Sequence, residues 1–364
     1  MSTSIPRRVL VTGASGNVGT ALLRRLATEV DPPEIIGVVR RPPTTPAPDT
    51  VPVAWHQLDL ADPHAAERLA PLMRTVDAVV HLAWGFQPTR DESYLRRTGV
   101  GGTAAVLEAA RHAGVDHLVH MSSVGVYSPA RDRTPVTEDY PHEGMPTSQY
   151  SRHKAAAEAL LDAAEADGGG GPVITRLRPG VVLQGDAASG LLRYFLPGYL
   201  PVFTLRLLPI VPIDHRLLVP VVHSDDVADA IVRTLARRPG GAINLAASSP
   251  LNSADFADAL GARAVNVPAA VLSTVVSLTW RARLQALEPG WVDLAFAVPQ
   301  LDTTRARDVL GWLPAVDARD ALHEVVSAAV AGRSLPTPPL RARTATDLLA
   351  RLLRSGPIGN RRQT

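Results

Sequence analysis

Cysteine is absent from the 364 residues of this sequence. Its absence excludes disulfides, thiolate metal ligands and a cysteine nucleophile, and it is compatible with a reducing compartment. A signal peptide is not expected either, because a strand-like apolar run is already reached at Val9. The sequence therefore favours a cytoplasmic protein.

Long uninterrupted apolar runs are lacking as well. The longest apolar stretches, near 191–222 and 265–280, contain Arg193, Arg206 and prolines or are too short for a membrane span. A surface or lipid-facing role for these stretches stays open. The formal net charge is only +2, and no basic run carries interleaved aromatic residues, so a nucleic-acid surface is not expected. No spacing of His, Asp and Glu indicates a metal site.

Lysine is almost absent. Lysine and arginine together number 37, and Lys154 is the single lysine among them. Alanine, arginine and proline are abundant, which indicates a strong coding bias away from lysine. The retention of Lys154 therefore calls for a reason.

The first half of the chain alternates short apolar runs with helical periods, which predicts parallel strands joined by right-handed crossovers. With 46% apolar residues the chain can also bury a sizeable core. We therefore expect an α/β fold with a doubly wound parallel sheet of the Rossmann type. The expected strands are 7–12, 34–39, 51–57, 77–81, 116–120 and 173–177, and the expected helices are 17–28, 63–73, 91–112 and 148–167.

Beyond residue 180 the pattern is less regular. We expect a Rossmann domain over 1–180 to which 217–247 returns, and a smaller substrate-binding region formed by 181–216 and 248–331. Residues 332–364 resemble a proline-rich linker and tail. Strands are expected at 217–222 and 242–245, and helices at 225–237, 253–260, 268–287, 303–310, 318–331 and 341–354.

A glycine-rich turn follows the first expected strand. Gly13, Gly16 and Gly19 are each three residues apart, and Ser15, Asn17 and Val18 fill the turn and the start of the next helix. Without side chains such a turn lets backbone N–H groups approach a pyrophosphate, and the helix N-terminus adds its positive end. The position at the start of a strand, turn and helix unit predicts a dinucleotide site rather than an ordinary tight turn.

The end of the second strand bears on the choice of cofactor. An NAD-binding unit usually has an acidic residue there to hold the ribose hydroxyls, whereas this chain has Arg40 and Arg41. A guanidinium suits a 2′-phosphate, so NADP is favoured over NAD, although both arginines could simply be solvated. Asp59 and Leu60 follow the third strand, where the acid could accept from the adenine amino group or cap a helix.

Tyr150 and Lys154 are expected to carry the proton chemistry. They are four residues apart at the start of a helix and so share one face. A free phenol titrates near ~10, and a neighbouring ammonium would lower that pKa toward neutrality. Lysine can also reach the cofactor ribose. Ser123 follows the fifth strand, where its hydroxyl could bind the oxygen of a carbonyl or alcohol.

These motifs together resemble the extended short-chain dehydrogenase/reductase family, the NAD-dependent epimerase/dehydratase group, over about residues 7–331. Further segments that fit its order and spacing are 81–83, 178–180, 222–228, 302–307 and 310–314. The resemblance implies that Tyr150 is the acid/base, that Lys154 lowers its pKa, and that Ser123 orients the substrate oxygen. It also implies a small-molecule substrate, a homodimer built on helices 91–112 and 148–167, and cofactor contacts from Leu82, Ala83, Tyr150, Lys154 and Pro179.

Several positions depart from the family pattern. Gly99 stands where the family usually has an Asn that supports the proton relay, and Gly180 replaces an Asn frequent in nucleotide-sugar enzymes. The region 186–222 is apolar, with Arg193, Arg206, His215 and Arg216 as its basic groups. This favours a less polar ketone or alcohol, unless the stretch is simply core and dimer surface. We interpret His223, Asp225 and Asp226 as a helix start, with Asp capping N–H groups.

Three functions are compatible with the sequence. The leading hypothesis is an NAD(P)-dependent oxidoreductase acting on a carbonyl/alcohol pair. A close alternative is a nucleotide-sugar epimerase or dehydratase that recycles its cofactor within one turnover. A non-catalytic NADP-binding sensor is a different class, against which the intact set of Ser123, Tyr150 and Lys154 argues.

Overall fold

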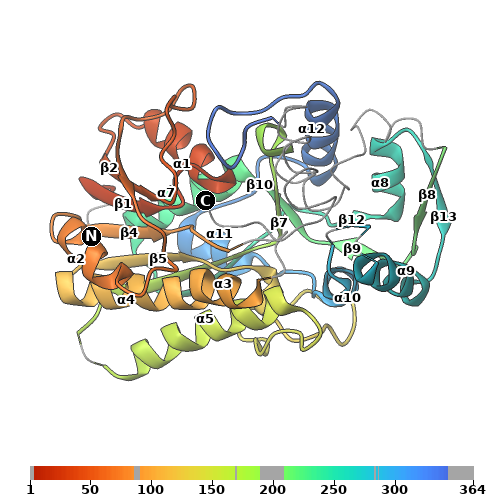
Figure 1. Cartoon of the computed structure of the whole chain (residues 1–364), viewed down its shortest axis with the longest axis horizontal. Coiled ribbons are helices and arrows are strands. Elements are labelled where there is room, and N and C mark those ends of the chain that lie inside the picture. The colour runs from red at the N-terminus through yellow and green to blue at the C-terminus, as the bar shows by residue number, and fades with distance from the viewer. Residues whose placement is uncertain are drawn as a thin grey trace.

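The computed structural model describes residues 4–85, 91–168, 170–188, 209–282, 284–285 and 287–342. A seven-stranded parallel sheet forms its centre, in the order β11-β6-β5-β4-β1-β2-β3 (Figure 1). Its strands are β1 (Arg8–Thr12), β2 (Glu34–Val39), β3 (Val53–Gln57), β4 (Ala78–His81), β5 (His117–Met121), β6 (Val173–Pro179) and β11 (Gly241–Leu245). The predicted α/β doubly wound fold is confirmed.

Helices cover both faces of this sheet. On one side lie α1 (Asn17–Ala27), α7 (Ser224–Arg237) and α11 (Thr304–Leu310); on the other lie α2 (Ala65–Met73), α3 (Glu92–Arg96), α4 (Gly102–Ala113) and α5 (Gln149–Ala166) (Figure 1). Alternate residues of β1 serve the two layers, because successive side chains of a strand point to opposite faces. Val9 and Val11 pack in the cluster of Leu22 and Ile231, whereas Leu10 packs with Leu161.

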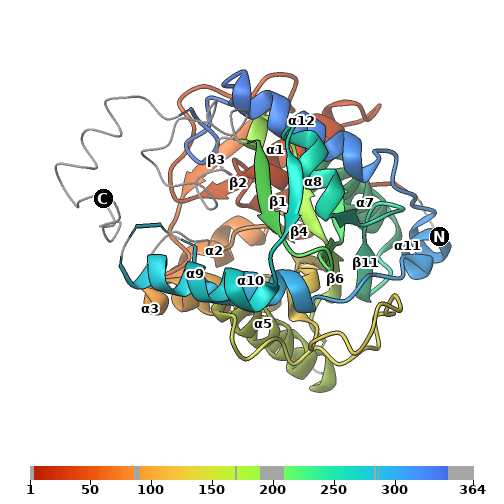
Figure 2. The same ribbon diagram turned by 90° about the vertical axis from the view of Figure 1, so that its right-hand side faces the viewer.

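In the part of the chain that the structure describes, the smaller region contains three two-stranded sheets and four α-helices. Its strands are β7 (Val181–Leu183), β8 (Ile210–Ile213), β9 (Leu218–Val219), β10 (Val221–His223), β12 (Leu251–Asn252) and β13 (Arg263–Asn266). Its helices are α8 (Ser253–Ala259), α9 (Ala269–Arg281), α10 (Pro289–Ala297) and α12 (Ala318–Val330). Figure 2 shows α9 and α10 in line above α5, which brings this region next to the helix that carries Tyr150.

Some expected elements differ from those observed. The expected helix 91–112 is divided by a π-helical turn at Arg97–Gly101, which lies between α3 and α4. The expected helix 268–287 ends at Arg281, and a separate helix, α10, begins at Pro289, because proline suits the first turn of a helix. Within 217–247 only α7 and β11 return to the central domain, since β10 pairs with β7 and β9 with β12.

Other expectations fall outside the described residues. These are Arg193, Arg206, most of the apolar region between β7 and β8, and nearly all of the expected helix 341–354. Among the residues that are described, no helix is long and apolar enough to cross a membrane.

Candidate active site

The glycine-rich turn leaves β1 at the carboxyl edge of the sheet. Gly13 has a φ of +72°, and its N–H donates to the Val38 carbonyl at 2.9 Å. A Cβ at Gly13 would lie 2.8 Å from the Ala83 nitrogen, and one at Gly19 would lie 2.5 Å from the Gly13 oxygen. Both positions therefore exclude a side chain. The close approach of the backbone thus explains why Gly13 and Gly19 are glycines.

The N-terminus of α1 fits an anionic ligand. No side chain hydrogen bond caps this helix at Gly16, and its first turn contains no acidic residue. The first N–H groups of a helix and its dipole attract phosphate. Ser15 is buried beside the turn, Val18 packs on the core, and the Asn17 amide donates to the Val182 carbonyl at 3.2 Å. The turn and α1 therefore match the pyrophosphate of a dinucleotide.

Leu82 and Ala83 complete the floor of this turn. The Leu82 N–H donates to the Thr12 carbonyl at 3.1 Å, and the Ala83 N–H donates to the Thr12 hydroxyl at 3.2 Å. That hydroxyl also lies 2.7 Å from Nδ1 of His81, whose pKa burial lowers to about 3. His81 is therefore a neutral support for the turn. Pro179, at the end of β6, is buried and pairs in register with Leu245.

Arg40 and Asp59 are brought together at the ends of β2 and β3. The Arg40 guanidinium donates to the Tyr94 hydroxyl, which in turn donates to Asp59 at 3.1 Å. The other carboxylate oxygen of Asp59 accepts from the Ala61 N–H at 3.0 Å. Leu60 is buried beneath them. Tyr94, from α3, is a site residue that the sequence analysis missed.

Arg41 adjoins the same group of charges. Burial lowers the pKa of its guanidinium, and the charges of Arg40 and Arg341 lower it further. The charges of Arg40 and Arg341 thus both act on the Arg41 guanidinium. Like charges around one guanidinium favour an anion bound near it.

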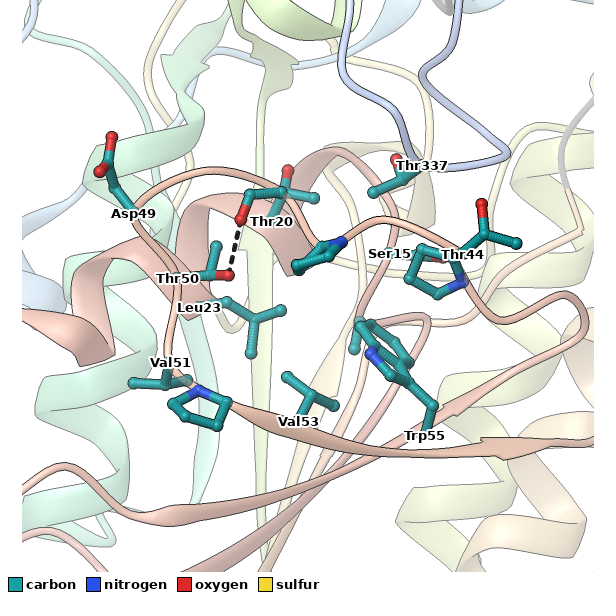
Figure 3. A pocket seen from close by; sticks show the side chains of 15 residues that line it. Ser15, Thr20, Leu23, Thr44, Asp49, Thr50, Val51, Val53, Trp55 and Thr337 are labelled. Carbon is teal, nitrogen blue, oxygen red and sulfur yellow. Dashed lines mark hydrogen bonds between the residues drawn. The ribbon is translucent and has the colours of Figure 1, made fainter.

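A cavity of ≈ 520 Å³ adjoins the glycine-rich turn on its β3 side (Figure 3). Ser15 and Thr20 line it from α1 and the turn, Thr44 from the loop after β2, and Thr337 from the segment that follows α12. None of Ser123, Tyr150 and Lys154 is among its lining residues. Of the residues predicted to bind the cofactor only Ser15 lines this cavity, which is therefore distinct from the expected reacting centre.

Ser123 and Tyr150 lie next to each other. The Ser123 hydroxyl accepts from the Gly125 N–H at 3.0 Å and so caps a short 3₁₀ turn after β5. The Ser151 hydroxyl, at the start of α5, donates to the Gly125 carbonyl at 2.5 Å and holds the helix against that turn. A Cβ at Gly125 would lie 3.1 Å from the Tyr150 ring and 3.4 Å from the Ser123 hydroxyl. The two predicted residues therefore face one space.

The pKa of Tyr150 moves opposite to our expectation. Burial raises it to about 12, and a hydrogen bond with Ser123 lowers it by less. The sequence predicted that the ammonium of Lys154 would lower it. In the structure that ammonium donates to the Met121 carbonyl at 2.8 Å and lies 3.5 Å from the centroid of the Trp84 ring. Tyr150 is therefore a protonated phenol in this conformation, suited to donating a proton.

Lys154 is almost fully buried. Burial lowers the pKa of its ammonium to about 7, although the charge of Glu158 raises it. A lysine that titrates near neutrality can both release and accept a proton at working pH.

A buried ion pair supports the helix behind this site. Glu158, one turn after Lys154, accepts from the Arg178 guanidinium through both carboxylate oxygens and from the Ser122 hydroxyl. Arg178 also donates to the Tyr127 hydroxyl at 3.0 Å. Arg178 belongs to the segment 178–180 that fits the family pattern, whereas Glu158 was not predicted from the sequence. Its spacing of four from Lys154 was the available signal.

Two tryptophans also reach the site without having been predicted. Trp84 directly follows Ala83, and its ring makes an edge contact with the Tyr150 ring. Trp291, near the start of α10, lies 4.9 Å from the Tyr150 ring, centroid to centroid. The position of Trp84 next to the expected cofactor contacts was a usable signal, whereas nothing local marks Trp291.

The group His223, Asp225 and Asp226 lies at the start of a helix, as interpreted from the sequence, but the side chain that caps this helix is His223 and not an Asp. Nδ1 of His223 accepts from the Asp225 N–H at 3.2 Å at the start of α7. The carboxylate of Asp226 accepts from the N–H groups of Ala315 and Val316 at 2.8 and 3.1 Å. Within the described part of the chain, no group of His, Asp and Glu could hold a metal ion.

The parallel sheet, the side-chain-free turn and the Ser, Tyr and Lys group at one sheet edge define a dinucleotide-binding α/β enzyme. The family model of the NAD dependent epimerase/dehydratase family matches residues 9–246, and the chain belongs to this family. That membership confirms the predicted class, the extended short-chain dehydrogenase/reductases. Because the family consists of enzymes, it also disfavours a non-catalytic sensor.

The relatives in this family carry out several reactions. The chain is 29% identical to a dTDP-6-deoxy-L-talose 4-dehydrogenase (NAD(P)(+)) of Kitasatospora kifunensis, covering 89% of this chain and 96% of the relative. It is 26% identical to a 4-hydroxy-2-methyl-3-oxo-4-farnesyl-3,4-dihydroquinoline-1-oxide ketoreductase of Stigmatella aurantiaca, covering 90% and 98%. It spans only 30% of a further relative, an uncharacterised protein of Mycobacterium tuberculosis.

Solved structures show the same fold. The UDP-glucose 4-epimerase of Thermus thermophilus, in complex with NAD, aligns with a TM-score of 0.65 at 22% identity, covering 88% of this chain and 98% of that one. The protein gox2253 aligns with a TM-score of 0.69 at 22% identity, covering 90% and 99%.

The burial of Lys154 has a consequence for stability. Its pKa is near 7 in the folded chain and ordinarily 10.5, so the unfolded chain binds more protons between these pH values. The cost of burying the ammonium is therefore complete below pH 7 and fades as the pH rises toward 10. We expect Lys154→Met to melt at a higher temperature than the wild type at pH 6, and the difference to shrink by pH 9. Other titrating groups are shared and cancel, so a difference independent of pH would contradict this account.

Proposed function

We propose that this protein is an NADP(H)-dependent oxidoreductase that interconverts a carbonyl and an alcohol, with Tyr150 as the acid/base. The observation that carries the proposal is the meeting of Ser123, Tyr150 and the buried Lys154 beside a glycine-rich turn that excludes side chains. We also propose that the central sheet with its helices is the Rossmann domain and that the smaller region binds the substrate, and we propose a small-molecule substrate and a cytoplasmic location.

The chain's own part in the reaction is to position an oxygen and move a proton. When bound, the nicotinamide cofactor supplies or accepts the hydride. The Ser123 hydroxyl orients the substrate oxygen, and Tyr150 exchanges a proton with that oxygen. A phenol with a pKa of about 12 is protonated at neutral pH, which is the form required to give a proton to a carbonyl oxygen in the reductive direction. Lys154, with a pKa of about 7, can restore that proton.

The residues proposed to hold the cofactor lie along the carboxyl edge of the sheet. The pyrophosphate would lie on the N–H groups of the turn and α1, formed by Gly13, Ser15, Gly16, Asn17, Val18 and Gly19. Asp59 and Leu60 would contact the adenine, and Leu82, Ala83, Tyr150, Lys154 and Pro179 the nicotinamide half. Arg40 and Arg41 favour NADP, and the nearby charge of Arg341 adds to the attraction for a 2′-phosphate.

The alternative is an epimerase or dehydratase that recycles its cofactor. It is supported by the sugar-modifying relatives, since a UDP-glucose 4-epimerase of Mycolicibacterium smegmatis is 28% identical over 336 residues. Gly180, in place of the Asn of many nucleotide-sugar enzymes, argues against it. A Cβ there would lie 3.0 Å from the Val221 nitrogen, so β10 leaves no space for an amide side chain. Net consumption of NADPH separates the two functions.

The proton-transfer role predicts the behaviour of Tyr150→Phe. The variant keeps the ring and loses the hydroxyl, so turnover of a carbonyl substrate should fall roughly 10²–10⁴-fold while NADPH affinity is retained. Lys154→Arg keeps the charge but is planar and larger, and it should be badly impaired. The rate of NADPH oxidation measures the turnover of each variant, and titration with NADPH measures its affinity for the cofactor. Unchanged turnover in both variants would show that the proton-transfer site lies elsewhere.

The cofactor preference is tested by titrating NADPH and NADH separately. Wild type should bind NADPH more tightly, and Arg40→Ala should weaken NADPH binding roughly tenfold or more with little effect on NADH. Arg307→Ala is the matched control, because that arginine is exposed and forms an ion pair with its neighbour Asp308. Equal wild-type affinity for the two cofactors would defeat the proposal.

A homodimer is the third expectation, supported by the family resemblance of the helices α3 to α5. These helices lie on one side of the molecule (Figure 1), and Leu160 of α5 remains 37% exposed there. Light scattering over a range of concentrations should give the mass of two chains, and Leu160→Glu should shift the mass toward one. A wild-type mass of one chain at every concentration would exclude the dimer.

A further inference from the structure

Three aromatic rings meet at the proposed reacting centre. They come from separate parts of the chain: Trp84 follows β4, Tyr150 begins α5, and Trp291 begins α10. The Trp84 and Tyr150 rings meet edge to face, with centroids 6.4 Å apart and an interplanar angle of 79°. The Trp291 and Tyr150 rings are 4.9 Å apart at 31°. Both distances lie in the range in which aromatic rings attract one another.

The backbone of α10 sets the position of Trp291. A Cβ on the preceding residue, Gly290, would lie 2.9 Å from Cα of Ser148 and still closer to the carbonyl oxygen of Thr147. These two residues lead directly into the helix that carries Tyr150. Because Gly290 allows the two backbones to touch, the start of α10 is seated beside Tyr150, and the indole next to it is held there.

Trp84 is held from two sides. One face of its ring receives the Lys154 ammonium, 3.5 Å from the centroid. On the side of the π-helical turn, a Cβ at Gly99 would lie 3.0–3.2 Å from atoms of the indole. The family's usual Asn at this position would therefore be in tight contact with Trp84, which would have to shift. The glycine and the tryptophan are complementary in volume.

We propose that Trp84 and Trp291 are the aromatic walls of the substrate site, and that the substrate is a planar aromatic or conjugated ketone, or the matching alcohol. The inference rests on the proposed function. Because both indoles contact the Tyr150 ring, a carbonyl oxygen bound at Ser123 and Tyr150 would place its substituents near them. Flat π systems gain attraction from such aromatic pairs beyond the burial of area. Hydroxyls facing ring carbons would lose water without gaining a partner.

The test compares two bicyclic ketones of equal size, 2-tetralone and trans-2-decalone, of which only the first has an aromatic ring. Their binding to the full-length enzyme saturated with NADP⁺ is measured by calorimetry, because the oxidised cofactor cannot reduce them. We expect 2-tetralone to bind at least about fivefold more tightly. UDP-glucose should bind more weakly than 2-tetralone.

Variants then assign that preference to the two walls. Trp291→Leu and Trp84→Leu keep apolar bulk, and each should remove most of the preference, while Trp291→Phe should retain most of it. Phe256→Leu, an aromatic-to-leucine change on α8, is the matched control and should leave the preference unchanged. Retained NADP⁺ affinity shows that each variant is folded.

Several outcomes would overturn the inference: equal binding of the two ketones, no binding of either, tighter binding of UDP-glucose, or a preference that survives both leucine variants. Failure of the proposed function is distinguishable. If 2-tetralone binds with the expected preference and Tyr150→Phe leaves turnover unchanged, the aromatic site stands and the proton-transfer assignment fails.

Discussion

The buried ion pair between Glu158 and Arg178 is the constraint on which the site depends. Both side chains are nearly or fully buried, and a buried charge without its partner would be strongly destabilising. The pair therefore fixes which face of α5 lies on β6. The hydrogen bond from Ser122 to Glu158 ties the end of β5 to the same point. Lys154 and Tyr150 lie one and two turns before Glu158, so their positions follow from where this pair is buried.

The same burial sets the chemistry of the site. Lys154 and Tyr150 lose water when α5 packs on the sheet, and desolvation disfavours the charged form of each. The pKa of the ammonium therefore falls, and that of the phenol rises. The two groups move toward neutral forms, which suits a donor phenol and a lysine that titrates near neutral pH. A single packing arrangement thus provides both the geometry and the protonation states.

Departures from the family pattern have physical reasons in their surroundings. Gly99 leaves the space that the Trp84 ring occupies, and Gly180 allows the backbone of β10 to approach. Each replacement removes an amide side chain and brings an apolar ring or a backbone closer instead. The residues proposed for proton transfer are of the types in the family pattern, whereas Gly99 and Gly180 depart from it. In the proposed function, proton transfer and substrate specificity therefore depend on different residues.

The sequence alone determined what depends on neighbours along the chain. Three patterns are local: the spacing of Gly13, Gly16 and Gly19, the Tyr150 and Lys154 pair, and the alternation of strands and helices. Local backbone geometry determines each of them, so each can be recognised in the sequence. The tertiary structure decided the rest. Glu158 meets Arg178 across twenty residues and Trp291 meets Tyr150 across many more, and the pKa directions follow from burial. Contacts between distant segments, and the desolvation that they cause, produce no periodic pattern in the sequence and so could not be predicted from it.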